Sequence, residues 1–140
     1  MTIRAAFAAI LFSAFLAAPA MAQADNPDQS CSFAPPIVEA TLKDFPPLIR
    51  SLLPSPIADR GEPFNLSDVV DPQRPMAGLI RGGHMGARWF AWVMQGGRAS
   101  QKLLFVFNVT PDGKVGVFRL SPVLAVDICT GTKNFLSSMP

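Results

Sequence analysis

The residues best suited to binding a ligand fall in the segment 81–88, where arginines flank a cluster of three glycines. Glycine lets backbone N–H groups approach a ligand closely, and a guanidinium can donate two parallel hydrogen bonds to a carboxylate or phosphate. The spacing matches neither the GxGxxG nor the GxxxxGK(S/T) phosphate-binding fingerprint. We predict a site for a small anionic ligand or a protein partner; the alternative is a flexible connection with solvated arginines. The predicted ligand-binding residues are Arg81, Gly82, Gly83, His84, Arg88, Trp89 and, from the next turn, Arg98.

His84 is the only histidine of the chain, and two other functions would depend on it. A small enzyme would use its imidazole as a general base beside a nearby carboxylate. A periplasmic copper protein would combine it with thioethers, for which Met76, Met85 and Met94 are the candidates. Because the chain has no HxxxH, CxxC or GxSxG motif, we predict no metal, cofactor or catalytic residue and keep both functions as alternatives. The favoured function is a non-enzymatic binding or protein-interaction module.

The first 24 residues have the layout of a cleaved export signal. Arg4 supplies the positive charge, Ala5 to Ala18 form the apolar stretch, and small residues allow cleavage after Ala22 or Ala24. Such a stretch spans only about 21 Å as a helix, short of the ~30 Å hydrocarbon core, which argues against a membrane anchor. The Ala-rich pattern is typical of bacteria. We therefore expect a periplasmic or secreted protein without membrane attachment after cleavage.

Cys31 and Cys129 are the only cysteines, and export would place them in an oxidising compartment. Two cysteines allow one intramolecular pairing, and no CxxC spacing suggests a reactive or metal-binding pair. We predict a structural disulfide that links the two ends of a single exported domain, residues 25–140.

Composition excludes several classes of protein. The chain carries 12 Lys and Arg against 10 Asp and Glu, so its near-neutral charge disfavours nucleic-acid binding or attachment to an anionic membrane by charge alone. With 49% hydrophobic and only 16% charged residues, most of the chain is expected to fold into a globular domain rather than to be disordered.

The elements that must position the predicted site divide into two halves. Ten of the 14 prolines lie between Pro27 and Pro75, which excludes long helices and central strands there. Two short helices still fit: one over 36–43, and one after Asp44 as its cap with prolines in the first turn. The apolar residues expected to face inward from the second helix are Leu48, Ile49, Leu52 and Leu53.

The second half has the pattern of an antiparallel meander. Aromatic and β-branched residues favour strands over 88–95, 101–109 and 114–120, with a further strand over 76–81 before a glycine-rich bend at 82–86. Gly96-Gly97 and Thr110-Pro111-Asp112-Gly113 supply the turns. After Ser121, the segment from Pro122 to Ser137 has near-helical apolar spacing, although a strand over 123–128 is the alternative.

Alternation along the strands makes both faces of the sheet apolar. Leu103, Phe105, Phe107 and Val109 share one side, whereas Leu104, Val106 and Asn108 share the other, and Trp89 and Trp92 point to opposite sides. The short helices can cover one face, and the other needs the N-terminal segment, a curled sheet, a ligand or a partner chain such as a homodimer mate.

The predicted fold is α+β, with short N-terminal helices, a three- or four-stranded antiparallel meander and a C-terminal helix. A small β-barrel or sandwich is the alternative.

Overall fold

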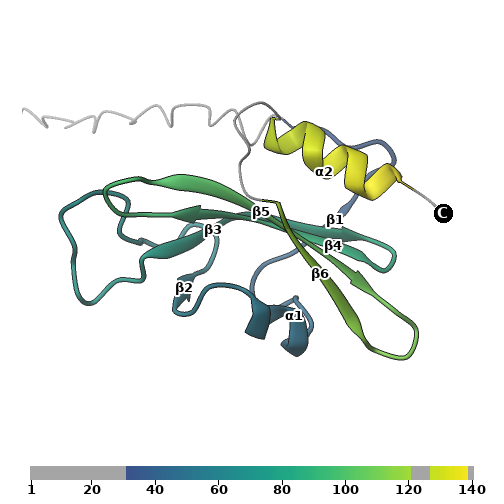
Figure 1. The fold of residues 1–140 in the computed structure, drawn as a ribbon, viewed down its shortest axis with the longest axis horizontal. Helices are drawn as coiled ribbons and strands as arrows, with labels where there is room; N and C mark the ends of the chain where they lie inside the picture. Colours follow the sequence, from purple (N-terminus) through teal and green to yellow (C-terminus); the bar gives the residue numbers. More distant parts are fainter. Residues whose placement is uncertain (1–30, 121–126, 139–140) are drawn as a thin grey trace, which may run out of the picture.

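A computed structural model describes residues 31–120 and 127–138 as one open sheet with a helix on each face (Figure 1). The strand order is β1-β3-β4-β5-β6, all neighbours antiparallel, and β2 adds a short parallel pairing to β3. The elements are β1 (Val38–Glu39), α1 (Pro47–Leu52), β2 (Ile57–Ala58), β3 (Ala77–Met85), β4 (Arg88–Gln95), β5 (Gln101–Val109), β6 (Val115–Leu120) and α2 (Ile128–Ser137).

The predicted α+β class and the meander β3 to β6 are confirmed, whereas the barrel alternative is wrong because the sheet is open. The sheet has six strands rather than three or four. The two additional strands come from the Pro-rich half, where two-residue pieces pair with β3 at opposite ends of that strand. Prolines that forbid long central strands therefore still allow short edge strands.

The first predicted N-terminal helix, over 36–43, is wrong. Its residues contain β1, which pairs with Gly83 and His84, and the backbone N–H of Ala40 continues this pairing to the Gly82 carbonyl at 2.9 Å. The prolines at 35 and 36 favour an extended backbone before β1, and pairing with β3 satisfies the polar groups that a helix would otherwise satisfy.

The second predicted helix is confirmed as α1, with proline in its first turn. The predicted cap is wrong: Pro46 occupies the N-cap position, and the Asp44 carboxylate instead accepts hydrogen bonds from the backbone N–H and hydroxyl of Thr41. Only part of the expected inward face is buried. Ile49 and Leu53 lie in the core, whereas Leu48 and Leu52 are 49% and 41% exposed.

The predicted bend at 82–86 is also wrong, because β3 continues through these glycines to Met85. A Cβ at Gly82 would lie 2.7 Å from the Phe45 ring, and one at Gly83 would lie 2.8 Å from the Val38 carbonyl oxygen. These glycines therefore allow neighbouring groups to lie close against the strand. The reversal of the chain takes only two residues, Gly86 and Ala87, with Gly86 at a φ of +58°.

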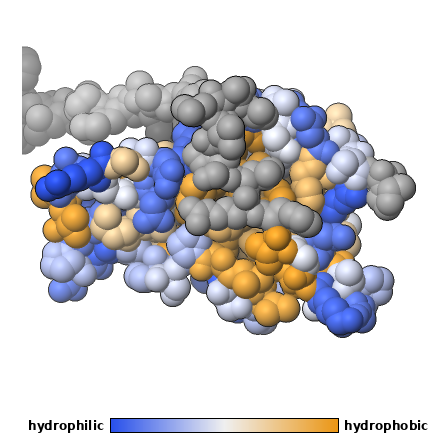
Figure 2. All heavy atoms as spheres, viewed as in Figure 1, coloured by the Kyte–Doolittle hydropathy of each residue, from blue (hydrophilic) through white to orange (hydrophobic). Residues whose placement is uncertain are grey.

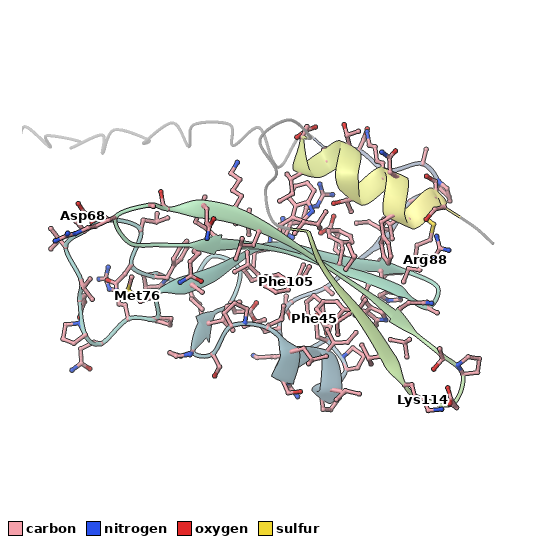
Figure 3. The ribbon with its side chains drawn as sticks, viewed as in Figure 1. Phe45, Asp68, Met76, Arg88, Phe105 and Lys114 are labelled. Atoms are coloured by element: carbon pink, nitrogen blue, oxygen red, sulfur yellow. A yellow bond between two sulfur atoms is a disulfide. The ribbon has the colours of Figure 1, made fainter. Side chains whose placement is uncertain are left out.

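The two faces of the sheet carry separate apolar cores, as the alternation predicted. Residues of the α1-side core include Phe45, Ile49, Leu53, Leu79, Val93, Leu103, Phe105 and Phe107, and Figure 3 shows Phe45 and Phe105 between the sheet and α1. The α2-side core includes Cys31, Phe90, Trp92, Leu104, Val106 and Leu136. Phe33 and Ile37 also pack on this second core, so α2 and the N-terminal segment, residues 31–37, cover that face together.

The predicted C-terminal helix is present as α2, although it begins at Ile128 rather than at Pro122. Asp127 caps it by accepting a hydrogen bond from the backbone N–H of Cys129.

The predicted Cys31–Cys129 disulfide is formed and joins the ends of the described chain across 98 residues. Neither described helix is long and apolar enough to cross a membrane. The predicted signal, residues 1–24, and most of the alternative strand over 123–128 lie outside the described residues.

Candidate functional site

Arg81 is the predicted site residue with the most surrounding partners. Its guanidinium donates to the Glu39 carboxylate through Nε at 3.0 Å and through a terminal nitrogen at 2.5 Å, and to the Cys31 carbonyl at 2.6 Å. It also lies over the rings of Phe33 and Trp92, 5.0 and 5.6 Å from their centroids. The side chain is only 12% exposed, so Arg81 ties the N-terminal segment to the sheet and already holds an internal anion.

Arg88 lies at the C-terminal end of α2, where its guanidinium forms hydrogen bonds with the helix (Figure 3). One of its terminal nitrogens donates to the carbonyls of Phe135 and Leu136 at 2.7 and 3.2 Å and lies 3.3 Å from the Ser138 hydroxyl. The last turn of α2 contains no basic residue of its own. Arg88 therefore supplies the positive charge that the unpaired carbonyls and negative dipole end of a helix favour.

The other predicted residues do not converge on one pocket with these arginines. Gly82 and Gly83 are buried within β3. The His84 ring stacks on Trp89 with centroids 4.2 Å apart, on the α1 side, where Trp89 also contacts Phe45. Arg98 is exposed in the β4–β5 turn, at the opposite end of β4 from Arg88. The set is thus distributed over both faces and both ends of the sheet.

The arrangement around His84 bears on the copper and enzyme alternatives. Its Nδ1 lies 3.2 Å from the Gly86 carbonyl oxygen, and within 31–120 and 127–138 no carboxylate hydrogen-bonds to the ring. Met85 packs on the α2-side core, across the sheet from His84, and Met76 lies beside Gly97 at the far end. In the same described ranges, no group of three His, Cys, Asp or Glu side chains comes together as a metal site.

The structure reveals an exposed apolar surface that the sequence analysis missed. Leu48 and Leu52 extend from α1 into solvent, and Val117 of β6 is 40% exposed. Val117 pairs with Phe107, a member of the α1-side core, so it lies on the same side of the sheet as α1. Figure 2 shows hydrophobic residues gathered where Figure 1 places α1 and β6. We call Leu48, Leu52 and Val117 the α1–β6 surface.

A signal for this surface was present in the sequence. Leu48-Ile49 and Leu52-Leu53 place apolar residues on two adjacent stripes of a single short helix. In the structure the stripe of Ile49 and Leu53 faces the core, and the neighbouring stripe of Leu48 and Leu52 remains exposed.

A second set of exposed apolar side chains lies on the loop 65–75, at the end of the molecule where Figure 3 labels Asp68. Leu66, Val69 and Val70 are 53%, 84% and 53% exposed. The loop is held from within by Asn65, whose amide donates to the carbonyls of Asp71 and Arg74 and accepts from the Asp71 backbone N–H, all at 2.8–2.9 Å. The loop therefore presents its apolar side chains from a hydrogen-bonded frame.

Comparison of the chain with models of protein families, with curated proteins and with solved structures finds no match. The functional conclusion therefore depends on the geometry of the chain itself.

Proposed function

We propose that this chain is an exported, non-enzymatic protein-interaction module that binds a partner protein through the α1–β6 surface. The observation that carries the proposal is the exposure of Leu48, Leu52 and Val117 on regular, packed elements. Single exposed apolar residues are common on proteins, but a group on one face favours an interaction site.

The surface is held in place by the core beneath it. Ile49, next to Leu48 on α1, is fully buried, and Leu53 is 4% exposed. Val117 is fixed by the β5–β6 ladder opposite fully buried Phe107. A partner therefore meets side chains on a pre-organised backbone, which lowers the entropy cost of association.

Export is supported by the signal pattern of residues 1–24 and by the disulfide between Cys31 and Cys129. The segment 81–88, predicted from the sequence as a glycine–arginine site, is a weaker basis for the function. Glu39 and the Cys31 carbonyl already accept hydrogen bonds from Arg81, so an external anion would compete with an internal carboxylate.

Site-specific photo-cross-linking in bacteria that export the chain tests the proposal. A benzophenone side chain at position 52 should yield one cross-linked product of defined mass, and Leu48→Ser with Val117→Ser should remove most of it. The matched control places the same cross-linker at Arg50, which is exposed on the other flank of α1. No product from position 52, or equal products from positions 50 and 52, would contradict the proposal. A product of twice the chain's mass would replace the partner protein by a second copy.

A further inference from the structure

On the face opposite the α1–β6 surface, the N-terminal segment and α2 enclose a groove of about 280 Å³. Phe33 and Pro35 form one wall, Met85 at the end of β3 contributes to the floor, and Lys133 and Leu136 of α2 form the other wall. In Figure 1 the N-terminal segment lies alongside α2, above the end of the sheet where β3 turns into β4. The groove is thus separate from the surface of the proposed function.

The groove is apolar inside and positive at its rim. Its carbon-rich lining comes mainly from Phe33, Pro35, Met85 and Leu136, and none of its lining residues among 31–120 and 127–138 carries a carboxylate. Lys133 is exposed, and within the part of the chain that the structure describes its ammonium forms no ion pair. A ligand with an apolar part and one negative group complements such a lining. Its apolar part is buried against the groove, and its negative group forms an ion pair with Lys133.

The walls of the groove are held by covalent and polar links. Ser32 and Phe33 follow directly after Cys31, and Lys133 lies one helical turn after Cys129, so the disulfide ties the two walls together. Arg81 also fixes the first wall by donating to the Cys31 carbonyl and lying over the Phe33 ring. A groove with fixed walls binds a small ligand at a lower entropy cost than a flexible one.

We propose that this groove binds a small amphipathic anion with a single carboxylate on a short aliphatic chain. The carboxylate pairs with Lys133, and the chain lies against Phe33, Met85 and Leu136. The groove volume of about 280 Å³ lies near the lower end of small-molecule pockets, roughly 300–1,000 Å³, so we take octanoate, a medium-chain carboxylate, as the probe.

Titration of the oxidised protein with sodium octanoate tests this site, with the ¹³C-methyl NMR signal of Met85 as the local reporter. The dissociation constant of octanoate, measured from this signal, is expected to be at least tenfold lower than that of butanoate, because each fully buried methylene adds roughly fourfold in affinity. Lys133→Gln should weaken octanoate binding by about two- to fivefold, the range of an exposed ion pair. Lys43→Gln, which removes an exposed charge from another part of the surface, is the matched control and should leave binding unchanged.

Ser32→Trp is designed to fill the groove from the N-terminal wall and should abolish the Met85 shift. Ser137→Phe fills it from α2 and serves if the first variant does not fold, as judged by near-ultraviolet circular dichroism. The proposal is overturned if millimolar octanoate leaves Met85 unshifted or if the shift survives in a folded groove-filling variant. It is also overturned if octanol binds as tightly as octanoate, since the negative group would then contribute nothing.

Discussion

The indole N–H of Trp92 donates a hydrogen bond to the hydroxyl of Thr132 at 2.8 Å, and both side chains are fully buried. The Thr132 hydroxyl in turn donates to the Ile128 carbonyl at 2.7 Å. This chain of two bonds joins the centre of β4 to α2 and satisfies the polar atom of the largest buried side chain. Two residues 40 positions apart therefore fix how the C-terminal helix sits on the sheet.

Replacement of Thr132 by valine keeps the shape of the side chain but removes the acceptor for the Trp92 indole. A buried donor without a partner costs about 1–3 kcal/mol, so the free energy of unfolding in urea should fall by that amount. Thr130→Val, an exposed position on the same helix, is the control and should change stability far less. Equal stability of the two variants would show that the Trp92–Thr132 bond does not fix α2.

The disulfide should contribute strongly to stability because it closes a long loop. The separation of 98 residues corresponds to about 4.7 kcal/mol in the chain-entropy account. Double replacement of Cys31 and Cys129 by serine should therefore lower the urea midpoint sharply, and reduction of the native protein should do the same. A reductant that lowered the stability of the double variant as much as that of the native protein would contradict this assignment.

Asn65 should control the order of the loop 65–75. Its side chain makes three hydrogen bonds while it is only 5% exposed, so Asn65→Ala leaves backbone groups of Asp71 and Arg74 without their partner. We expect a loss of about 2 kcal/mol in unfolding free energy and faster amide hydrogen exchange across the loop. Asn108→Ala, at an exposed strand position, is the control. Unchanged exchange in Asn65→Ala would refute the role of this side chain.

The β5–β6 turn should respond to acid through Asp112. The Lys114 ammonium, which lies 2.8 Å from the carboxylate, and the Thr110 hydroxyl lower the pKa of Asp112 below its ordinary value of 3.8. A depressed pKa stabilises the folded turn above that ordinary value, and the contribution is lost as the pH falls through the folded pKa. A carboxyl NMR titration should give the lowered pKa, and Lys114→Gln should return it toward 3.8, whereas Lys43→Gln should not. A native pKa at or above 3.8 would contradict the described contacts.

Several features could be predicted because they depend on local pattern or on simple counting. The alternation in 101–109 assigned each side chain to a face, since successive residues of a strand point to opposite sides. Proline in the first turn located α1. Two cysteines in one chain allowed a single pairing, which the structure contains.

The roles of the arginines and glycines could not be predicted in this way. The segment 81–88 has the composition of a binding loop, yet Gly82 and Gly83 lie within β3, where Phe45 and Val38 approach too closely to leave room for a Cβ. The same difficulty applied to His84, whose ring stacks on Trp89 across the β3–β4 hairpin.

The sequence by itself determined the four strands of the meander, which faces they turn inward and which cysteines join, because these features depend on neighbours a few residues apart or on the lack of an alternative partner. Only the tertiary structure decided what each charged side chain does. Arg81 meets Glu39 across 42 residues, and Arg88 meets the Phe135 carbonyl across 47. Such partners are brought together by the register of β1 on β3 and by the docking of α2, and no spacing within a single segment encodes either of these.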